Sequence, residues 1–143
     1  MYELVKTQCQ YDYFPYAFKN FIQHIDEYRE NNWSFYYNLR FDKDLNSFAY
    51  ALRKDDIQTF QQMCLENRKL INAKIDPNIF IPCIYAHHYP TSVMYSALFG
   101  SIRCCLFLIR NGARSASWDR KYRLLPSYSI VGGNENILIQ CLQ

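Results

Sequence analysis

The chain has 143 residues, of which 50% are hydrophobic and 17% are aromatic, and its formal net charge is +3. This much apolar material excludes an intrinsically disordered protein. Thirteen Tyr and ten Phe beside only four Gly argue against a turn-rich β-sandwich. The mild charge falls short of the basic excess of a nucleic-acid-binding protein. We therefore expect one compact unit or a short stack of repeats.

Residues 1–45 are predicted to form a helical cap. Their apolar side chains recur at the i, i+3, i+4, i+7 and i+10 spacing of one helix face, at Phe18, Phe21, Ile22, Ile25 and Tyr28. The first ten residues contain no apolar core of the kind found in secretory signals. No apolar run reaches the roughly 18 residues that span a bilayer. The sequence thus predicts an intracellular, cytoplasmic protein without a membrane span.

Residues 46–64 are predicted to form a first pair of short helices. Asp55 and Asp56 occupy the turn between them, where Asp56 suits the N-cap of the second helix. The segment 65–90 then carries the steps Asp76-Pro77, Ile81-Pro82 and Tyr89-Pro90. Proline steps of this kind interrupt helices, so we expect an irregular insert here.

Two later segments, 91–123 and 124–143, share one pattern. Residues 91–100 align without a gap with residues 124–133, which places Gly100 and Gly133 33 residues apart. Each glycine suits a tight turn with positive φ. A second helix follows each turn, with apolar residues on one face at Cys104, Cys105, Leu108 and Ile109 and again at Ile137, Leu138, Cys141 and Leu142.

The segment that begins at Thr91 resembles the ankyrin motif T-P-L-H-x-A-A-x-x-G, with matches at Thr91, Ala97 and Gly100. The helix after Gly100 and its closing Gly-Ala are similar to the second ankyrin helix, and 33 residues is the ankyrin period. About half of the chain resembles the family, in the manner of the divergent ankyrin proteins expanded in unicellular parasites. The resemblance implies an all-α fold, a short ankyrin-type helical repeat stack with repeats at 46–64, 91–123 and 124–143.

The resemblance also implies a protein–protein interaction scaffold that has no catalytic activity and no cofactor. In that family the loop between repeats forms a finger beside the concave face. The candidate partner-binding residues are therefore Arg114, Trp118, Arg120, Lys121, Tyr122 and Arg123 on the loop, and Tyr95 and Tyr128 as exposed positions of the first helices. We expect an acidic protein partner and disfavour nucleic acid. A solvated loop whose aromatic side chains pack back onto the stack is the alternative.

The chain departs from the family pattern at several positions. Met94 and Ser127 replace the family's histidine, and Tyr122 replaces the hairpin glycine, which predicts a looser finger. The last predicted helix is apolar and has no polar cap. A degenerate or truncated repeat fragment without independent function is therefore a second hypothesis.

A metal-binding or cysteine enzyme is the third hypothesis. Cys83, His87 and His88 are close in sequence, but zinc needs four ligands and no second pair has suitable spacing. Cys104 and Cys105 fall on an apolar helix face, where thiols are inert. We expect the six cysteines to be reduced and to pack as small apolar side chains.

Overall fold

The computed structural model describes residues 19, 21–41, 47–78, 80–81 and 83–143. The described residues form α-helices, two 3₁₀ helices and no strand, so the prediction of an all-α fold is confirmed for this part of the chain. The helices are α3 (Ile25–Glu30), α4 (Ser34–Phe41), α5 (Ser47–Arg53), α6 (Ile57–Glu66), η1 (Arg68–Asn72), η2 (Ile84–His87), α7 (Ser92–Leu98), α8 (Ile102–Arg110), α9 (Leu125–Gly132) and α10 (Glu135–Leu142).

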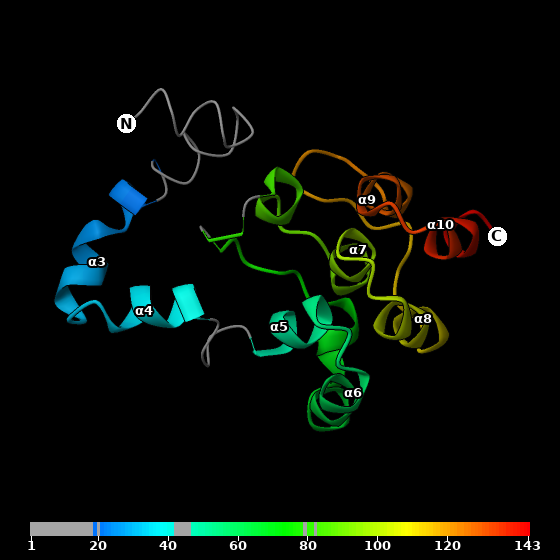
Figure 1. Cartoon of the computed structure of the whole chain (residues 1–143), viewed down its shortest axis with the longest axis horizontal. Coiled ribbons are helices and arrows are strands. Elements are labelled where there is room, and N and C mark those ends of the chain that lie inside the picture. Colours follow the sequence, from blue (N-terminus) through cyan, green and yellow to red (C-terminus); the bar gives the residue numbers. More distant parts are fainter. Residues whose placement is uncertain (1–18, 20, 42–46, 79, 82) are drawn as a thin grey trace.

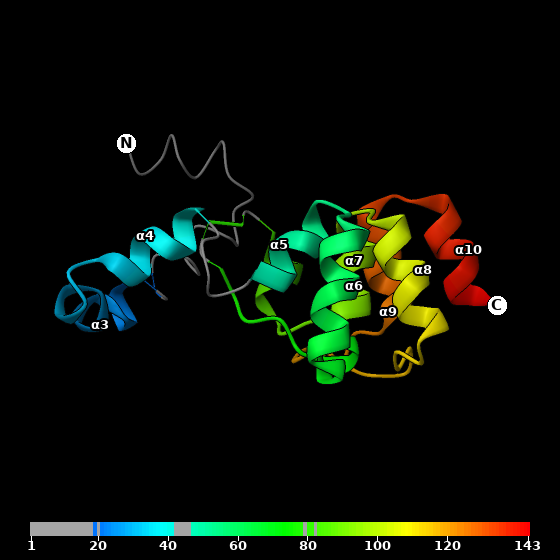
Figure 2. The ribbon, with the colours of Figure 1, turned by 90° about the horizontal axis from the view of Figure 1, so that it is seen from below.

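Helices α5 to α10 form three helical hairpins that stack in two layers. Helices α5, α7 and α9 contact one another in series, and α6, α8 and α10 form the second layer (Figures 1 and 2). The turns of the three hairpins have left-handed residues at Asp55 (φ 53°), Gly100 (φ 66°) and Gly133 (φ 68°). Both predicted glycine turns are therefore confirmed, and in the first hairpin an aspartate takes the same conformation.

Helices α6, α7 and α10 begin at a polar side chain that accepts a hydrogen bond from a free backbone N–H group. Asp56 accepts a hydrogen bond from Thr59 N at 3.2 Å, as predicted, and Asn134 accepts one from Ile137 N at 3.1 Å. Thr91 caps α7 through Met94 N in the same way. These bonds satisfy donors that have no partner within the helix.

The stack is held together by a shared apolar core between the two layers. Leu52, Phe60, Met94, Leu108 and Ile137 are all fully buried. Their positions in both helices of the hairpins show that the core runs continuously from α5 to α10, as each hairpin covers the apolar side of its neighbour.

Close approach of α7 and α9 depends on small residues. Ser96 and Ala97 are fully buried, and a β-carbon built on Gly132 would lie 2.1 Å from the carbonyl oxygen of Ala97. A side chain at Gly132 would therefore push the two helices apart. Small residues at 96 and 97 on α7 and at Gly132 on α9 therefore allow the two helices to pack closely.

The insert is more ordered than the proline steps predict. Helix α6 continues to Glu66, and η1 and η2 follow. The ends of the insert are fixed to each other because Ile75 N donates to Pro90 O at 2.8 Å and Ser92 N donates to Ala73 O at 2.9 Å. The serine hydroxyl also donates to Leu70 O at 2.6 Å.

Helices α3 and α4 lie beyond the α5 side of the stack in both views (Figures 1 and 2). Tyr28 is buried among aromatic rings, with Tyr36 edge-on at 5.8 Å, and Tyr36 in turn contacts Phe80 of the insert at 5.3 Å. Residues 1–18 of the predicted cap, including Phe18, lie outside the described residues, and a cap over the first hairpin stays a prediction. Within the described residues, no helix has the length and apolar character needed to cross a membrane.

Candidate binding surface

The loop 114–123 joins α8 to α9 and exposes two large aromatic side chains. Trp118 is 55% exposed and Tyr122 is 80% exposed, and their rings meet edge to face with centroids 6.0 Å apart. Arg120 and Lys121 between them are also exposed. The loop therefore presents a mixed aromatic and cationic surface, the composition that favours contacts with proteins.

Asp119, whose side chain is fully buried, fixes the loop backbone. Its Oδ1 accepts hydrogen bonds from Lys121 N at 2.7 Å and from Arg123 N at 2.9 Å. Asp119 N donates in return to Arg123 O at 3.1 Å, which closes the hairpin. Tyr122, at the tip, has the left-handed φ of 58° that a glycine would adopt. A tyrosine thus keeps a tight hairpin turn here without a glycine.

The second carboxylate oxygen of Asp119 joins the loop to the stack. It accepts from Arg123 Nε at 2.7 Å and from the Tyr128 hydroxyl at 2.7 Å. Burial raises the pKa of Asp119, but hydrogen bonds from Arg123, Tyr128 and Lys121 outweigh it and hold the pKa below its usual value. Asp119 is therefore ionised at neutral pH, and its charge is balanced by Arg123.

Arg123, one of the predicted partner-binding residues, makes internal contacts in the structure. Its side chain is only 22% exposed, pairs with Asp119, and lies over the Tyr85 ring at 4.0 Å. A guanidinium stacked on an aromatic ring and bonded to a buried carboxylate holds the loop in place.

The prediction that Tyr95 and Tyr128 are exposed is wrong. Tyr95 is 2% exposed and Tyr128 is fully buried. Tyr95 packs against Phe99 and accepts a hydrogen bond from Arg53 Nη1 at 2.7 Å, while the Tyr128 ring meets Tyr85 edge to face at 5.3 Å. Their hydroxyl groups find internal partners, so these amphipathic side chains can lie in the core. Leu98, on the same helix as Tyr95, is also buried.

The sequence pattern does not show that Lys74, His88 and Tyr89 of the insert contact the loop. The Arg120 guanidinium lies over the ring of Tyr89 at 4.0 Å. Arg120 N donates to His88 O at 3.0 Å, and Lys74 Nζ donates to Trp118 O at 3.4 Å. The insert therefore supports the loop from the side, and Lys74 borders an open hollow of about 550 Å³ with Ser117, Trp118 and Tyr122.

The cysteines among the described residues are free thiols. Burial, with the nearby Asp55 charge, raises the pKa of Cys104 to about 12. Burial likewise raises the pKa of Cys105 to about 11. Because the thiolate is the nucleophile, neither thiol is primed for catalysis at neutral pH.

Cys83, His87 and His88, the residues considered for a metal-binding enzyme, do not form a metal-binding group in the described part of the chain. His87 is buried, and its Nε2–H donates to Ile81 O at 2.8 Å. Burial lowers the pKa of His87, so the ring is neutral at pH 7. The described part of the chain brings no three His, Cys, Asp or Glu side chains into a group that could hold a metal ion.

No protein-family model, curated protein sequence or solved structure matches this chain.

Proposed function

We propose that this chain is a protein-interaction module of the ankyrin type, with the loop 114–123 as its contact surface. The observation that carries the proposal is the exposed pair Trp118 and Tyr122 on a loop whose backbone is fixed by the buried carboxylate of Asp119. Aromatic side chains on a backbone that is already ordered lose little conformational freedom on binding. This is how the fold would lower the cost of association.

The charge of the surface favours an acidic partner. The loop contains four basic residues and one carboxylate, and that carboxylate is buried against Arg123. The loop has no other carboxylate to balance the positive charges that remain exposed. These belong to Arg114, Arg120, Lys121 and the neighbouring Lys74. The chain as a whole carries only +3, which argues for local recognition of an acidic protein segment over the diffuse binding of nucleic acid.

The ankyrin assignment is supported by the period and the chemistry of the repeats. Gly100 and Gly133 are 33 residues apart and have the same left-handed conformation. Thr91 caps the first helix of its repeat, as the first residue of the motif would. A helical stack with two layers is the architecture expected of such repeats.

The experiment is affinity capture with the wild-type chain and with the double variant Trp118→Ala, Arg120→Ala. We expect the variant to retain about one tenth or less of the captured partner, because hot-spot aromatic and arginine side chains typically contribute that much. Circular dichroism should show unchanged helicity, since both side chains are exposed.

A matched control removes one exposed aromatic and one exposed arginine from a distant surface. Tyr37→Ala with Arg29→Ala makes the same change on α3 and α4. We expect this control to capture as much partner as the wild type. Binding of the partner to either protein should weaken as the salt concentration rises. Equal capture by the Trp118, Arg120 variant would reject the loop as the binding surface.

A further inference from the structure

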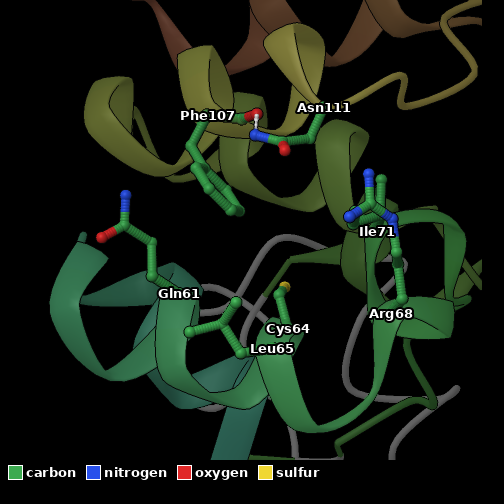
Figure 3. A pocket seen from close by; sticks show the side chains of 7 residues that line it. All are labelled: Gln61, Cys64, Leu65, Arg68, Ile71, Phe107 and Asn111. Atoms are coloured by element: carbon green, nitrogen blue, oxygen red, sulfur yellow. Dashed lines mark hydrogen bonds between the residues drawn. The ribbon is translucent and has the colours of Figure 1, made fainter.

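A small pocket lies between the C-terminal ends of α6 and α8, on the layer of second helices (Figure 3). Its walls are mostly apolar, formed by Cys64, Leu65, Ile71 and Phe107. The sulfur of Cys64 and the ring of Phe107 extend toward each other from opposite helices, and Leu65, 81% exposed, stands at the rim. None of these residues belongs to the loop 114–123.

The volume of the pocket limits what it can hold. It measures about 200 Å³, below the roughly 300 Å³ at which sites for drug-sized ligands and cofactors begin. At about 30 Å³ for each water in the liquid, it has room for about seven non-hydrogen atoms. A short branched aliphatic group fits this space, whereas a nucleotide or a flavin is too large.

A single cation marks the chemistry of the pocket. Arg68 lines it on the side opposite Gln61 (Figure 3). Among the described residues, no carboxylate lies within ion-pair distance of Arg68. An exposed guanidinium beside apolar walls is complementary to an anion that carries an apolar tail.

The segments that border the pocket carry more basic than acidic residues. The negative ends of the α6 and α8 dipoles oppose an anion. Against them, residues 66–72 and 110–114 hold Arg68, Lys69, Arg110 and Arg114 and the single acid Glu66. The two segments are adjacent, since Arg114 N donates to Asn72 Oδ1 at 2.8 Å. Asn111 also donates to Phe107 O at 2.8 Å and so satisfies one carbonyl of the α8 end.

We propose that this pocket binds a small apolar carboxylate, with a branched aliphatic tail between Cys64 and Phe107 and the carboxylate on Arg68. The site is separate from the loop 114–123, and the proposal does not depend on the function proposed for that loop. A suitable probe is 4-methylpentanoate, whose neutral counterpart of the same shape is 4-methylpentanamide.

The test follows the NMR signals of the full chain during titration with each probe. For 4-methylpentanoate we expect saturable shifts at Leu65, Ile71 and Phe107, with a dissociation constant on the order of 1 mM, as a ligand of so few atoms allows. The amide should bind about three- to fivefold more weakly, the scale of an exposed ion pair. Gln61→Trp, a substitution at the rim, should abolish the shifts by filling the entrance.

Two variants separate the role of Arg68 from general charge. Arg68→Gln should weaken binding of the acid about three- to fivefold and leave binding of the amide unchanged. Lys69→Gln, which removes an equal charge from the next residue, should change neither. Absence of saturable shifts, or equal affinity for acid and amide, would overturn the proposal. N-acetyl-leucine mimics the C-terminal residue of a peptide. If it binds at least as tightly as 4-methylpentanoate, the proposal of a small free carboxylic acid is overturned and a peptide C-terminus is indicated.

Discussion

The carboxylate of Asp55 stabilises a helix to which it does not belong. It accepts hydrogen bonds from Cys104 N at 2.9 Å and from Arg103 N at 3.3 Å, the free donors of α8. Ser101, the residue in the N-cap position of that helix, makes no side-chain capping bond and instead donates to Leu52 O. The turn of the first hairpin thus caps the second helix of the next.

Replacing Asp55 by Asn should lower the free energy of unfolding by about 1 kcal/mol at pH 7. Asparagine tolerates the left-handed φ, so the substitution removes mainly the negative charge and one acceptor. The ion pair with Arg103 contributes little because that arginine is 64% exposed. Chemical denaturation of the two proteins measures the difference.

The same pair of proteins should show a pH dependence of known sign. Burial raises the pKa of Asp55, but hydrogen bonds from Cys104 and Arg103 outweigh it, so the folded pKa is lowered. A lowered folded pKa gives stability that is complete above the unfolded value of about 3.9 and is lost as pH falls through the folded pKa. The difference between wild type and Asp55→Asn should therefore be constant from pH 7 to 5 and shrink below pH 4. A difference that grows on acidification would contradict this role.

The sequence predicts contacts between residues that are close in the chain. It does not predict contacts between residues that are distant in the chain. Asp56 caps its own helix three residues away, which the sequence pattern predicts. The partner of Asp55 lies at Cys104, and no local pattern shows that contact. Asp119 is similar: its charge was visible in the sequence, but its burial follows from Arg123, Tyr128 and the stack against which they pack.

Two glycines at the end of α9 are required for different physical reasons, one for its backbone conformation and one for the space that it leaves. Gly133 has a φ of 68° and open space around it, so Gly133→Ala adds only backbone strain. Gly132 has no positive φ, but a β-carbon there would lie 2.1 Å from Ala97 O and 2.9 Å from Leu98 O. The first substitution tests the turn, and the second tests the contact between α7 and α9.

We expect Gly133→Ala to cost about 1 kcal/mol of stability, the penalty for an alanine in the left-handed region. Gly132→Ala should cost about 3 kcal/mol, because backbone atoms cannot move aside as a flexible side chain can. Thermal unfolding of both variants provides the comparison. A smaller loss for Gly132→Ala than for Gly133→Ala would mean that α7 and α9 are not packed this closely.

The helical hairpins were the most predictable elements. Apolar periodicity and the glycine spacing located α7 to α10 because these signals lie within each hairpin. The insert was less predictable, since its 3₁₀ helices depend on contacts such as Ser92 Oγ to Leu70 O across 22 residues. Tyr95 and Tyr128 were assigned to the wrong environment, because a tyrosine suits both a surface and a core with a partner for its hydroxyl.

The helices of the stack α5 to α10 differ in the number of helices that they contact. Helix α8 packs against both α6 and α10. Helix α10 packs against α8 and α9. Ile130, Val131 and Leu142 of the last hairpin are 65%, 45% and 69% exposed. Stability in such a stack is a sum of contacts between neighbours.

Helix α10 should therefore open more readily than α8. Native-state hydrogen exchange should give amides of α10 protection factors at least about tenfold below those of α8, as expected for an element with fewer neighbours. A substitution such as Ile130→Lys should leave the protection of α8 unchanged, because the side chain is exposed. Equal protection of the two helices would contradict a stack that is stabilised by its neighbours.

Hydrogen bonds fix the backbone of the loop 114–123, the proposed contact surface, in the free chain. Hydrogen exchange of the free chain tests this claim directly. The amides of Asp119, Arg120, Lys121 and Arg123 donate to Arg123 O, His88 O and Asp119 Oδ1, so we expect protection at least about tenfold above that of an unstructured chain. Asp119→Asn should remove that protection while the α7 amides keep theirs. Loop amides that exchange at the unstructured rate in the wild type would contradict the claim.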